Sequence, residues 1–466
     1  MTVQRGSCTG RRPVHVFRGI KGVAAGLVLA AASFALAQPA AAAPARHAKA
    51  VAATPASGYS VADFYAARHG APFWLAAGSG DAARTLVGVL ADSKIDGFDP
   101  DSYGVSALND ALREAASGNR KAVARADVML SQAFVAYVSD LRRDPGFNIV
   151  YVDAQLRPRV PAARSILEQA ANAPSLDAYV RNFAWMNSLY GQLRQALVEK
   201  HYASEDERQR LELNLERVRA LPAGKGRFVM VNAAEQRLYM WEDGMPVDSM
   251  VVVVGKPKYP TPLMAAYIRF ASLNPYWFVP PDLAAERIAP NVLRRGLKYL
   301  DELGYQVLSD WVPDPQIIDP KTIDWKAVAA GKKEVLIRQL PGPHNAMGRM
   351  KFMFPNTEGV YLHDNPDRGL FQEASRLYSG GCVRLEDAPR LGRWLFGHDL
   401  EWEGATTEQP VPLSPPVPVY ITYLTAMPNN GSIAFFDDVY GRDKARMAAN
   451  DQGSGSGATV ASGSGN

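Results

Sequence analysis

The sequence predicts an α+β protein: an N-terminal helical domain followed by a mainly β domain. Apolar residues recur at helical spacing from about residue 60 to residue 220. Near Gly224 the pattern changes to short runs rich in Val, Tyr and Trp, which are typical of strands. The chain has 466 residues, of which 47% are hydrophobic and 21% charged, so it can bury a substantial core.

The first 43 residues have the layout of a secretory signal peptide. Basic residues extend to Lys21, an apolar run covers residues 22–37, and Ala35-Leu36-Ala37 offers a small-x-small cleavage site. An uncleaved membrane anchor is the alternative, but the run is short for a membrane span. We therefore expect export to the periplasm, with residues 44–58, rich in Ala and Pro, forming a linker.

Charge and cysteine content exclude several classes of protein. The formal charge is +4, from 51 basic and 47 acidic residues, but five basic residues and no acid lie within residues 1–37. The rest of the chain is therefore close to neutral and lacks the basic surface of a nucleic-acid-binding protein. Two cysteines, Cys8 and Cys382, exclude a disulfide framework and a thiolate-rich metal site. We expect no metal and no cofactor.

The helical domain is predicted over residues 59–222. One helix is expected around residues 128–141, ended by Pro145-Gly146, and another apolar face spans residues 176–190. The sequence Ser204-Glu205-Asp206-Glu207 has the spacing of a capping box before a further helix. His69 and His201 are expected on the surface.

The β domain is predicted over residues 223–445, with a disordered tail over 446–466. Strands are expected at 227–231, 237–241, 250–254, 334–338, 359–362 and 417–425. Between them, residues 271–331 are irregular and contain a helix near 291–303, so we expect an insertion that covers the active site as a lid. Insertions of this length inside a compact domain are usually functional.

The residues best suited to chemistry are His363 and Cys382. Cys382 follows Gly380-Gly381, and a tight glycine turn can direct backbone N–H groups at one point, as an oxyanion hole requires. A nearby imidazole can deprotonate the thiol, and Arg384 can hold a substrate carboxylate or add positive potential. Together they suggest acyl transfer through a thioester. The alternative is a buried structural cysteine and a histidine without a catalytic role.

These residues give the sequence a specific resemblance to a known family. His363 followed by Ser379-Gly380-Gly381-Cys382-Val383-Arg384 resembles the motif of the L,D-transpeptidases with a YkuD-type catalytic domain, in particular the large Gram-negative periplasmic kind. Further stretches that resemble the family are 231–239, 255–262, 274–280, 338–348 and 434–441. The resemblance covers roughly residues 224–443, and the N-terminal helices resemble the scaffold domain of the large members. It implies a helical scaffold domain followed by a mainly β catalytic domain of the β-sandwich type.

The resemblance implies roles for individual residues. Cys382 is the expected nucleophile and His363 the expected base, with His344 as the second choice; many relatives have His where this chain has Gly380. The N–H groups of Gly381 and Cys382 are expected to hold the oxyanion. The expected oxyanion- and substrate-binding residues are Gly381, Gly380, Ser379, Arg384, Tyr361 and Trp277. Tyr361 and Trp277 could equally be core aromatics, and Asp364 is expected on the opposite strand face from His363.

The implied reaction forms 3→3 cross-links between peptidoglycan stem peptides. Cys382 attacks the third residue of a donor tetrapeptide, expels the terminal D-Ala, and passes the acyl group to the amine of an acceptor stem. The partners are therefore stem peptides and not nucleic acid, and carbapenems are expected to acylate Cys382. Water or a free D-amino acid as acceptor would instead make the protein a carboxypeptidase, an endopeptidase or an exchange enzyme. A non-catalytic wall-binding scaffold is a further alternative.

Overall fold

The computed structural model describes residues 60–312, 314–401 and 406–455. The predicted signal peptide and linker lie outside these residues. Within them, no helix is both long and apolar enough to cross a lipid bilayer. The α+β class is confirmed, with helices dominating the first part of the described chain and strands the second.

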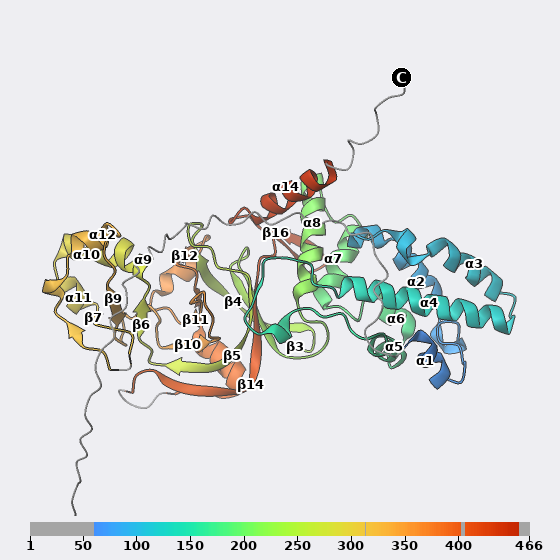
Figure 1. Cartoon of the computed structure of the whole chain (residues 1–466), viewed down its shortest axis with the longest axis horizontal. Coiled ribbons are helices and arrows are strands. Elements are labelled where there is room, and N and C mark those ends of the chain that lie inside the picture. The colour runs from blue at the N-terminus through green and yellow to red at the C-terminus, as the bar shows by residue number, and fades with distance from the viewer. Residues whose placement is uncertain (1–59, 313, 402–405, 456–466) are drawn as a thin grey trace, which may run out of the picture. The chain divides into compact units, whose positions relative to one another are not determined.

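The N-terminal half is helical as predicted (Figure 1). Its α-helices are α1 (Val61–Ala67), α2 (Ala82–Ala91), α3 (Val105–Ala115), α4 (Arg120–Leu141), α5 (Ala163–Ala171), α6 (Leu176–Arg181), α7 (Ser188–Val198) and α8 (Glu205–Arg217). The helix predicted at 128–141 is the second half of α4, which begins at the capping residue Asn119. His69 and His201 are exposed, as expected.

Two local predictions in this half need correction. The apolar face at 176–190 belongs to two helices, because Phe183 adopts a left-handed backbone (φ 53°) and Asn187 caps a new helix, α7. Of the two hydrogen bonds of the predicted capping box, only the one from the Glu207 backbone to the Ser204 side chain forms. Ser204 Oγ accepts the N–H of Glu207, but the Glu207 carboxylate accepts the N–H of Ala203, one residue before the cap.

The β domain is built on one curved sheet that, in the described chain, contains ten strands. They are β1 (Val150–Tyr151), β2 (Phe228–Asn232), β3 (Arg237–Glu242), β4 (Met245–Gly255), β5 (Met264–Leu273), β10 (Met350–Met353), β11 (Leu362–His363), β12 (Leu377–Ser379), β13 (Val383–Leu385) and β14 (Gln409–Thr422). The long strand β14 pairs with β2 on one side and with β5 on the other. The sheet therefore closes on itself. Where the resemblance implied a β-sandwich, the structure has one closed sheet around a common core.

Alternation along the strands separates an apolar face from a polar one. Leu362, Val383, Phe352 and Ala271 belong to the core enclosed by the sheet, together with residues of α13 (Ala388–Phe396). Their strand neighbours His363, Arg384, Lys351 and Ser272 are in register with one another across β11, β13, β10 and β5. Because side chains alternate along a strand, these four residues share the face opposite to the core.

The insertion is a small subdomain with its own sheet and core. Its elements are β6 (Trp277–Val279), α9 (Pro281–Leu283), the π-helix η6 (Ala284–Ile288), α10 (Ala289–Arg295), α11 (Lys298–Glu302), β7 (Tyr305–Leu308), β8 (Ile317–Ile318), α12 (Trp325–Ala329) and β9 (Leu336–Gln339). The strands pair in the order β6-β9-β7-β8, and the helices gather around them (Figure 1).

The predicted limits of the insertion, 271–331, are wrong at both ends. Residues 271–273 still belong to β5 of the main sheet, and the chain returns to that sheet only at β10. The strand expected at 334–338 in the main sheet is β9, which pairs with β6 and β7 inside the insertion. Sequence pattern alone identified β9 as a strand but carried no information on which sheet it joins.

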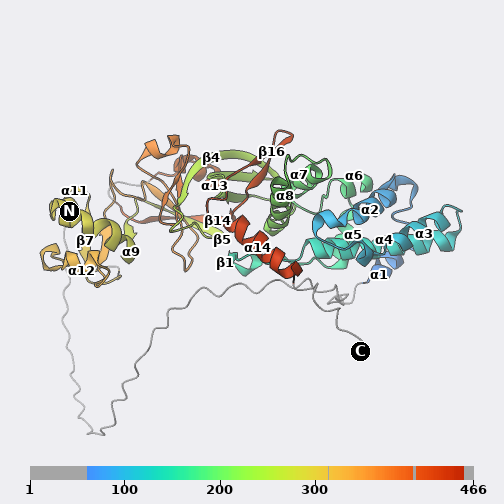
Figure 2. The same cartoon turned by 90° about the horizontal axis from the view of Figure 1, so that it is seen from above.

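The C-terminal segment packs against α8. After the hairpin β15 (Ala426–Asn429) and β16 (Ser432–Phe435), the chain forms α14 (Arg442–Gly455). Asp443 of α14 pairs with Arg217 of α8 (2.5 Å) and accepts the hydroxyl of Thr425 (2.6 Å), and Figure 2 shows α14 beside this region. The predicted tail was therefore placed too early: residues 446–455 continue the helix, and residues 456–466 lie outside the described residues.

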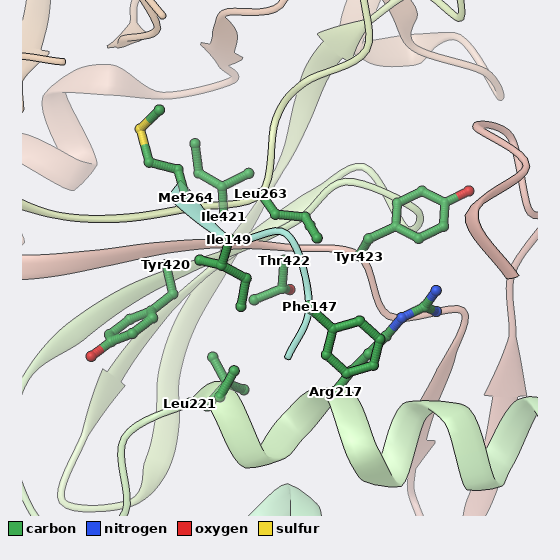
Figure 3. A pocket seen from close by; sticks show the side chains of 11 residues that line it. Phe147, Ile149, Arg217, Leu221, Leu263, Met264, Tyr420, Ile421, Thr422 and Tyr423 are labelled. Atoms are coloured by element: carbon green, nitrogen blue, oxygen red, sulfur yellow. The ribbon is translucent and has the colours of Figure 1, made fainter. Parts of the chain in front are cut away.

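A small cavity lies between the end of α8 and strand β14 (Figure 3). Phe147, Ile149, Leu221 and Tyr420 line it, and its volume is about 30 Å³. This leaves room for one or two water molecules, not for a peptide. None of its lining residues is an expected site residue, so it is a packing defect and not a substrate pocket.

Candidate active site

Cys382 lies in the turn between β12 and β13 and is half-buried. Gly381 adopts φ +120° here, a conformation that L side chains rarely adopt, so glycine is required at this position. The Sγ atom of Cys382 hydrogen bonds to the carbonyl oxygen of Gly359, 3.5 Å away. The strand pairing of β13 with β11 brings this turn beside His363.

Two side chains fix the shape of the turn. Ser379 Oγ accepts the N–H of Gly381 (3.0 Å) and donates to the carbonyl of Cys382 (2.6 Å). Thr261 Oγ1 donates to the carbonyl of Gly381 (2.8 Å) and accepts the N–H of Gly255 (2.9 Å). A Cβ on Gly255 would lie 2.0 Å from the carbonyl oxygen of Tyr259, so the loop after β4 can reach the turn only with glycine there.

The expected oxyanion hole needs revision for Gly381. Its N–H is already committed to Ser379 Oγ, whereas in the described part of the chain the N–H groups of Gly380 and Cys382 have no hydrogen-bond acceptor. Backbone N–H groups without a partner are the ones available to a ligand. The structure therefore leaves Cys382 and Gly380 as the donors that a developing oxyanion could use.

His363 lies in β11, opposite Lys351 of β10 and Arg384 of β13, and is 2% exposed. Its Nδ1 atom lies 2.6 Å from the carbonyl oxygen of Asp364. Because a carbonyl can only accept, Nδ1 carries the ring proton and Nε2 has a free lone pair. The group that orients the ring is thus the backbone of the next residue.

The carboxylate of Asp364 does not orient the His363 ring. Asp364 was predicted to lie on the strand face opposite to His363, and its carboxylate has partners of its own. It accepts the N–H of Arg349 (2.9 Å) and pairs with Arg368 (2.8 Å). A Cβ on Gly348 would clash with it, so the segment before β10 packs directly onto this side chain. Asp364 therefore fixes the entry to β10 and does not touch the imidazole.

Burial and charge hold the two reactive groups in their neutral forms. Burial, together with the positive charges of Arg384 and Lys351, lowers the pKa of His363 to about 3, although its bonds to the backbone of Asp364 and Met347 oppose the shift. Burial also raises the pKa of the Cys382 thiol, against the effects of the Tyr361 backbone and of Arg384. The resting site is a thiol beside a neutral imidazole.

This depressed pKa makes the stability of the protein depend on pH. Unfolded histidine titrates near 6.5 and folded His363 near 3, so the unfolded chain binds one more proton between these values. The stability that His363 contributes is complete above pH 6.5 and is lost as pH falls toward 3, at up to about 1.4 kcal/mol per pH unit. We expect urea unfolding of the wild type at pH 7, 6, 5 and 4 to show a steeper loss than the His363→Gln variant. Parallel curves would contradict the assignment.

Arg384 and Tyr361 complete the polar face around the thiol. Burial raises the pKa of Tyr361, and Cys382 adds to the shift. Tyr361 precedes His363 by two residues on the segment paired with β13, so its side chain is on the same face of the sheet as the imidazole. Tyr361 belongs to none of the apolar clusters of the described chain, so the structure favours the site-lining interpretation over the core one. The Nζ atom of Lys351 lies 6.0 Å from the Tyr361 ring and pairs with Glu408 (3.1 Å).

The insertion touches the nucleophile turn through α9. A Cβ on Gly380 would lie 3.3 Å from Cδ1 of Leu283, so this glycine allows the insertion to approach closely. Phe278 of β6 is 46% exposed, and its ring centre is 5.8 Å from Nζ of Lys351 on the polar face. The position of the insertion therefore fits the lid that the sequence suggested.

Trp277 does not face the site. It is 8% exposed and belongs to the insertion's own core, with Val279, Ile337 and Tyr305. Trp277 was therefore the wrong aromatic residue to expect in the substrate pocket. The strand alternates, so its neighbour Phe278 points the other way.

Truncating these two neighbours should have opposite effects. We expect Trp277→Ala to destabilise the protein by about 3–5 kcal/mol, because it opens a cavity in a small core. Phe278→Ala should leave the melting temperature close to that of the wild type and lower turnover. Thermal unfolding and turnover measured on both variants test this. A stable Trp277→Ala variant would contradict the core assignment.

The second-choice base, His344, is exposed. Its backbone carbonyl accepts a hydrogen bond from the Gln339 side chain (2.8 Å), and this bond does not involve the imidazole. Among the described residues, no three His, Cys, Asp or Glu side chains are grouped so as to hold a metal ion.

Sequence reasoning missed three contributors to the site: Thr261, Lys351 and Phe278. Thr261 was noted only as part of a stretch resembling the family, and Lys351 lies in a strand, β10, that was not predicted. The signal for Phe278 was present, since it alternates with Trp277 in a short strand between prolines.

A thiol on a glycine turn, next to a strand that carries a neutral imidazole, is an arrangement that a cysteine nucleophile can use. Residues 226–413, which include both groups, match the L,D-transpeptidase catalytic domain family, YkuD, and residues 59–197 match the Scaffold domain family. The chain therefore contains a YkuD L,D-transpeptidase catalytic domain preceded by a Scaffold domain.

A curated protein of Haemophilus influenzae, named "Putative L,D-transpeptidase", is 29% identical over 397 residues, which cover 82% of this chain and 78% of that protein. Solved structures were also found. The L,D-transpeptidase from Mycobacterium smegmatis is 15% identical, with a TM-score of 0.21 over 43% of this chain and 61% of its own length. The catalytic domain from the Enterococcus faecium L,D-transpeptidase is 15% identical, with a TM-score of 0.19 over 42% of this chain and 97% of its own.

Proposed function

We propose that the protein is a cysteine-dependent L,D-transpeptidase that forms 3→3 cross-links between peptidoglycan stems through a thioester on Cys382. The observation that carries the proposal is the position of Cys382, on a glycine turn that leads directly into β13, the strand paired with the His363 strand β11, inside the domain that matches the family. We further propose that the protein works in the periplasm, on the strength of its N-terminal sequence.

In the first half-reaction, the thiol turns from Gly359 toward the imidazole. Nε2 of His363 takes the thiol proton while Sγ attacks the carbonyl carbon of the third stem residue, and the N–H of Cys382 stabilises the oxyanion. When the tetrahedral intermediate collapses, the C–N bond breaks, His363 returns the proton to the leaving D-Ala amine, and a thioester remains.

In the second half-reaction, the amine of an acceptor stem attacks the thioester. His363 accepts a proton from this amine and delivers it to the departing thiolate, so the cross-link forms and the enzyme is regenerated. The neutral imidazole suits both steps, since it must begin each of them with a free lone pair.

Water or a free D-amino acid could replace the acceptor stem, which would give a tripeptide or an exchanged tetrapeptide. We therefore expect the exported form, incubated with disaccharide tetrapeptide, to produce a cross-linked dimer detectable by mass. A tripeptide as the sole product would identify a carboxypeptidase. The absence of any product would favour the non-catalytic scaffold.

The proposed nucleophile also predicts a covalent inhibitor. A carbapenem contains an activated amide carbonyl that Sγ can attack as it attacks the stem. We expect intact-mass analysis after incubation with a carbapenem to give a single adduct, and the Cys382→Ala variant to give none. An adduct that persists in the variant would place the reactive group elsewhere.

A further inference from the structure

Two arginine side chains near the Cys382 turn have no anionic partner among the described residues. Arg384 follows Cys382 by two residues in β13, and Arg287 belongs to the π-helix η6 of the insertion. Within the part of the chain that the structure describes, neither side chain makes a hydrogen bond or an ion pair. The charge of Arg287 disfavours the charged form of Arg384, and an anion bound near both would oppose this repulsion.

Their proximity follows from a direct contact of the backbone. Leu283 at the start of the η6 helical segment meets the nucleophile turn at Gly380. Arg287 comes four residues later, and residues spaced by four lie on the same side of a helix. Arg287 therefore extends from roughly the same side of this helical segment as Leu283. Consistent with this placement, its charge lowers the pKa of Arg384, an effect second only to burial.

The acidic groups near the pair are committed or distant. Glu286, next to Arg287, pairs with Lys258 and accepts the hydroxyl of Tyr259 (2.6 Å). The charge of Asp367 acts on Arg384, but the two make no ion pair. Glu408 is used by Lys351. Among the described residues, no acidic side chain pairs with either guanidinium group, so both groups are available to bind an anionic ligand.

We propose that Arg287 and Arg384 form a subsite for a carboxylate of the donor stem peptide, with the insertion supplying one of its two walls. The inference rests on the proposed function. A planar guanidinium binds a carboxylate through two parallel hydrogen bonds. Arg384 follows Cys382 by only two residues, so it can bind a carboxylate that lies next to the attacked carbonyl. The donor offers two such groups, the C-terminal carboxylate of D-Ala and the side-chain carboxylate of diaminopimelate.

Binding to the Cys382→Ala protein tests the subsite without requiring turnover. Three tetrapeptides are compared by calorimetry: the unmodified peptide, its C-terminal amide, and the peptide amidated on the diaminopimelate side chain. Adding Arg287→Ala should weaken binding of the unmodified peptide about tenfold. For one of the two amides, Arg287→Ala should have no further effect, and that amide identifies the carboxylate. Arg295→Ala removes the same charge from an exposed pair with Glu302 in the insertion and should bind all three peptides normally.

An equal loss on all three peptides, or no loss on any, would overturn the subsite. Both variants should melt as their parent does, since Arg287 and Arg295 are exposed. Turnover in the wild-type background separates this result from the proposed function. Charge-dependent binding without cross-linking would reject the transpeptidase and retain the subsite, whereas cross-linking that is insensitive to Arg287 would do the reverse.

Discussion

Replacing Cys382 with Ala should abolish cross-linking completely while the protein remains folded. The thiol is the only group in the proposed mechanism that forms a covalent bond with the donor, and its loss leaves only positioning and oxyanion contacts. The side chain is small and half-buried, and its hydrogen bond to the Gly359 carbonyl is long, at 3.5 Å. Stability should therefore change little.

The measurement is dimer formation by mass, with the melting temperature recorded on the same sample. Ser379→Ala provides a matched control in the same turn. It removes two hydrogen bonds that shape the turn but leaves the thiol, so we expect it to slow the reaction without stopping it. Turnover in Cys382→Ala above background would rule out Cys382 as the nucleophile.

The second large effect is expected from His363→Ala, which should lower kcat by about 10²–10⁴-fold at pH 7. Because the pKa of the imidazole is about 3, the wild type keeps its base between pH 5 and pH 8 and should show no loss from histidine protonation in that range. The variant depends on spontaneous ionisation of a thiol whose pKa is raised, so its rate should increase as the pH rises.

The ratio of wild-type to variant rate should therefore shrink toward high pH, and alkylation of Cys382 by iodoacetamide should follow the same trend. His344→Ala is the control, because this histidine is exposed and uses only its backbone. If His363→Ala retains its rate and His344→Ala loses it, the base has been misassigned.

Much of the fold could be predicted because its signals are local. The change of period near Gly224, the strands at 227–231 and 237–241, and the helix ending at Leu141 are each determined by a few neighbouring residues. Cys382 and His363 were identified from local signals too: the Gly380-Gly381 turn before the cysteine and the strand that contains the histidine. The pairing of β11 with β13 then brings these two segments side by side.

The errors concern partners that are far apart in the sequence. Whether β9 joins the main sheet or the insertion depends on pairing with β6, about 60 residues earlier, which no local pattern encodes. The commitment of the Gly381 N–H to Ser379, and the attachment of the turn to Thr261, depend on side-chain rotation and on a loop 120 residues away. Trp277 and Phe278 are equally aromatic, and only the orientation of β6 decides which one is buried.

The closure of the sheet by β14 also has a consequence for how the chain folds. Val419 pairs with Val229 of β2 and with Ala266 of β5, so the last long strand to be synthesised lies between the first strands of the domain. Contacts so distant in sequence form slowly, because the intervening loop must be closed first. Until β14 arrives, β2 and β5 each present an unpaired edge, and such edges promote association between chains. The domain is therefore most prone to aggregation during the interval between synthesis of β2 and arrival of β14, and a chain truncated before Gln409 would remain in that state.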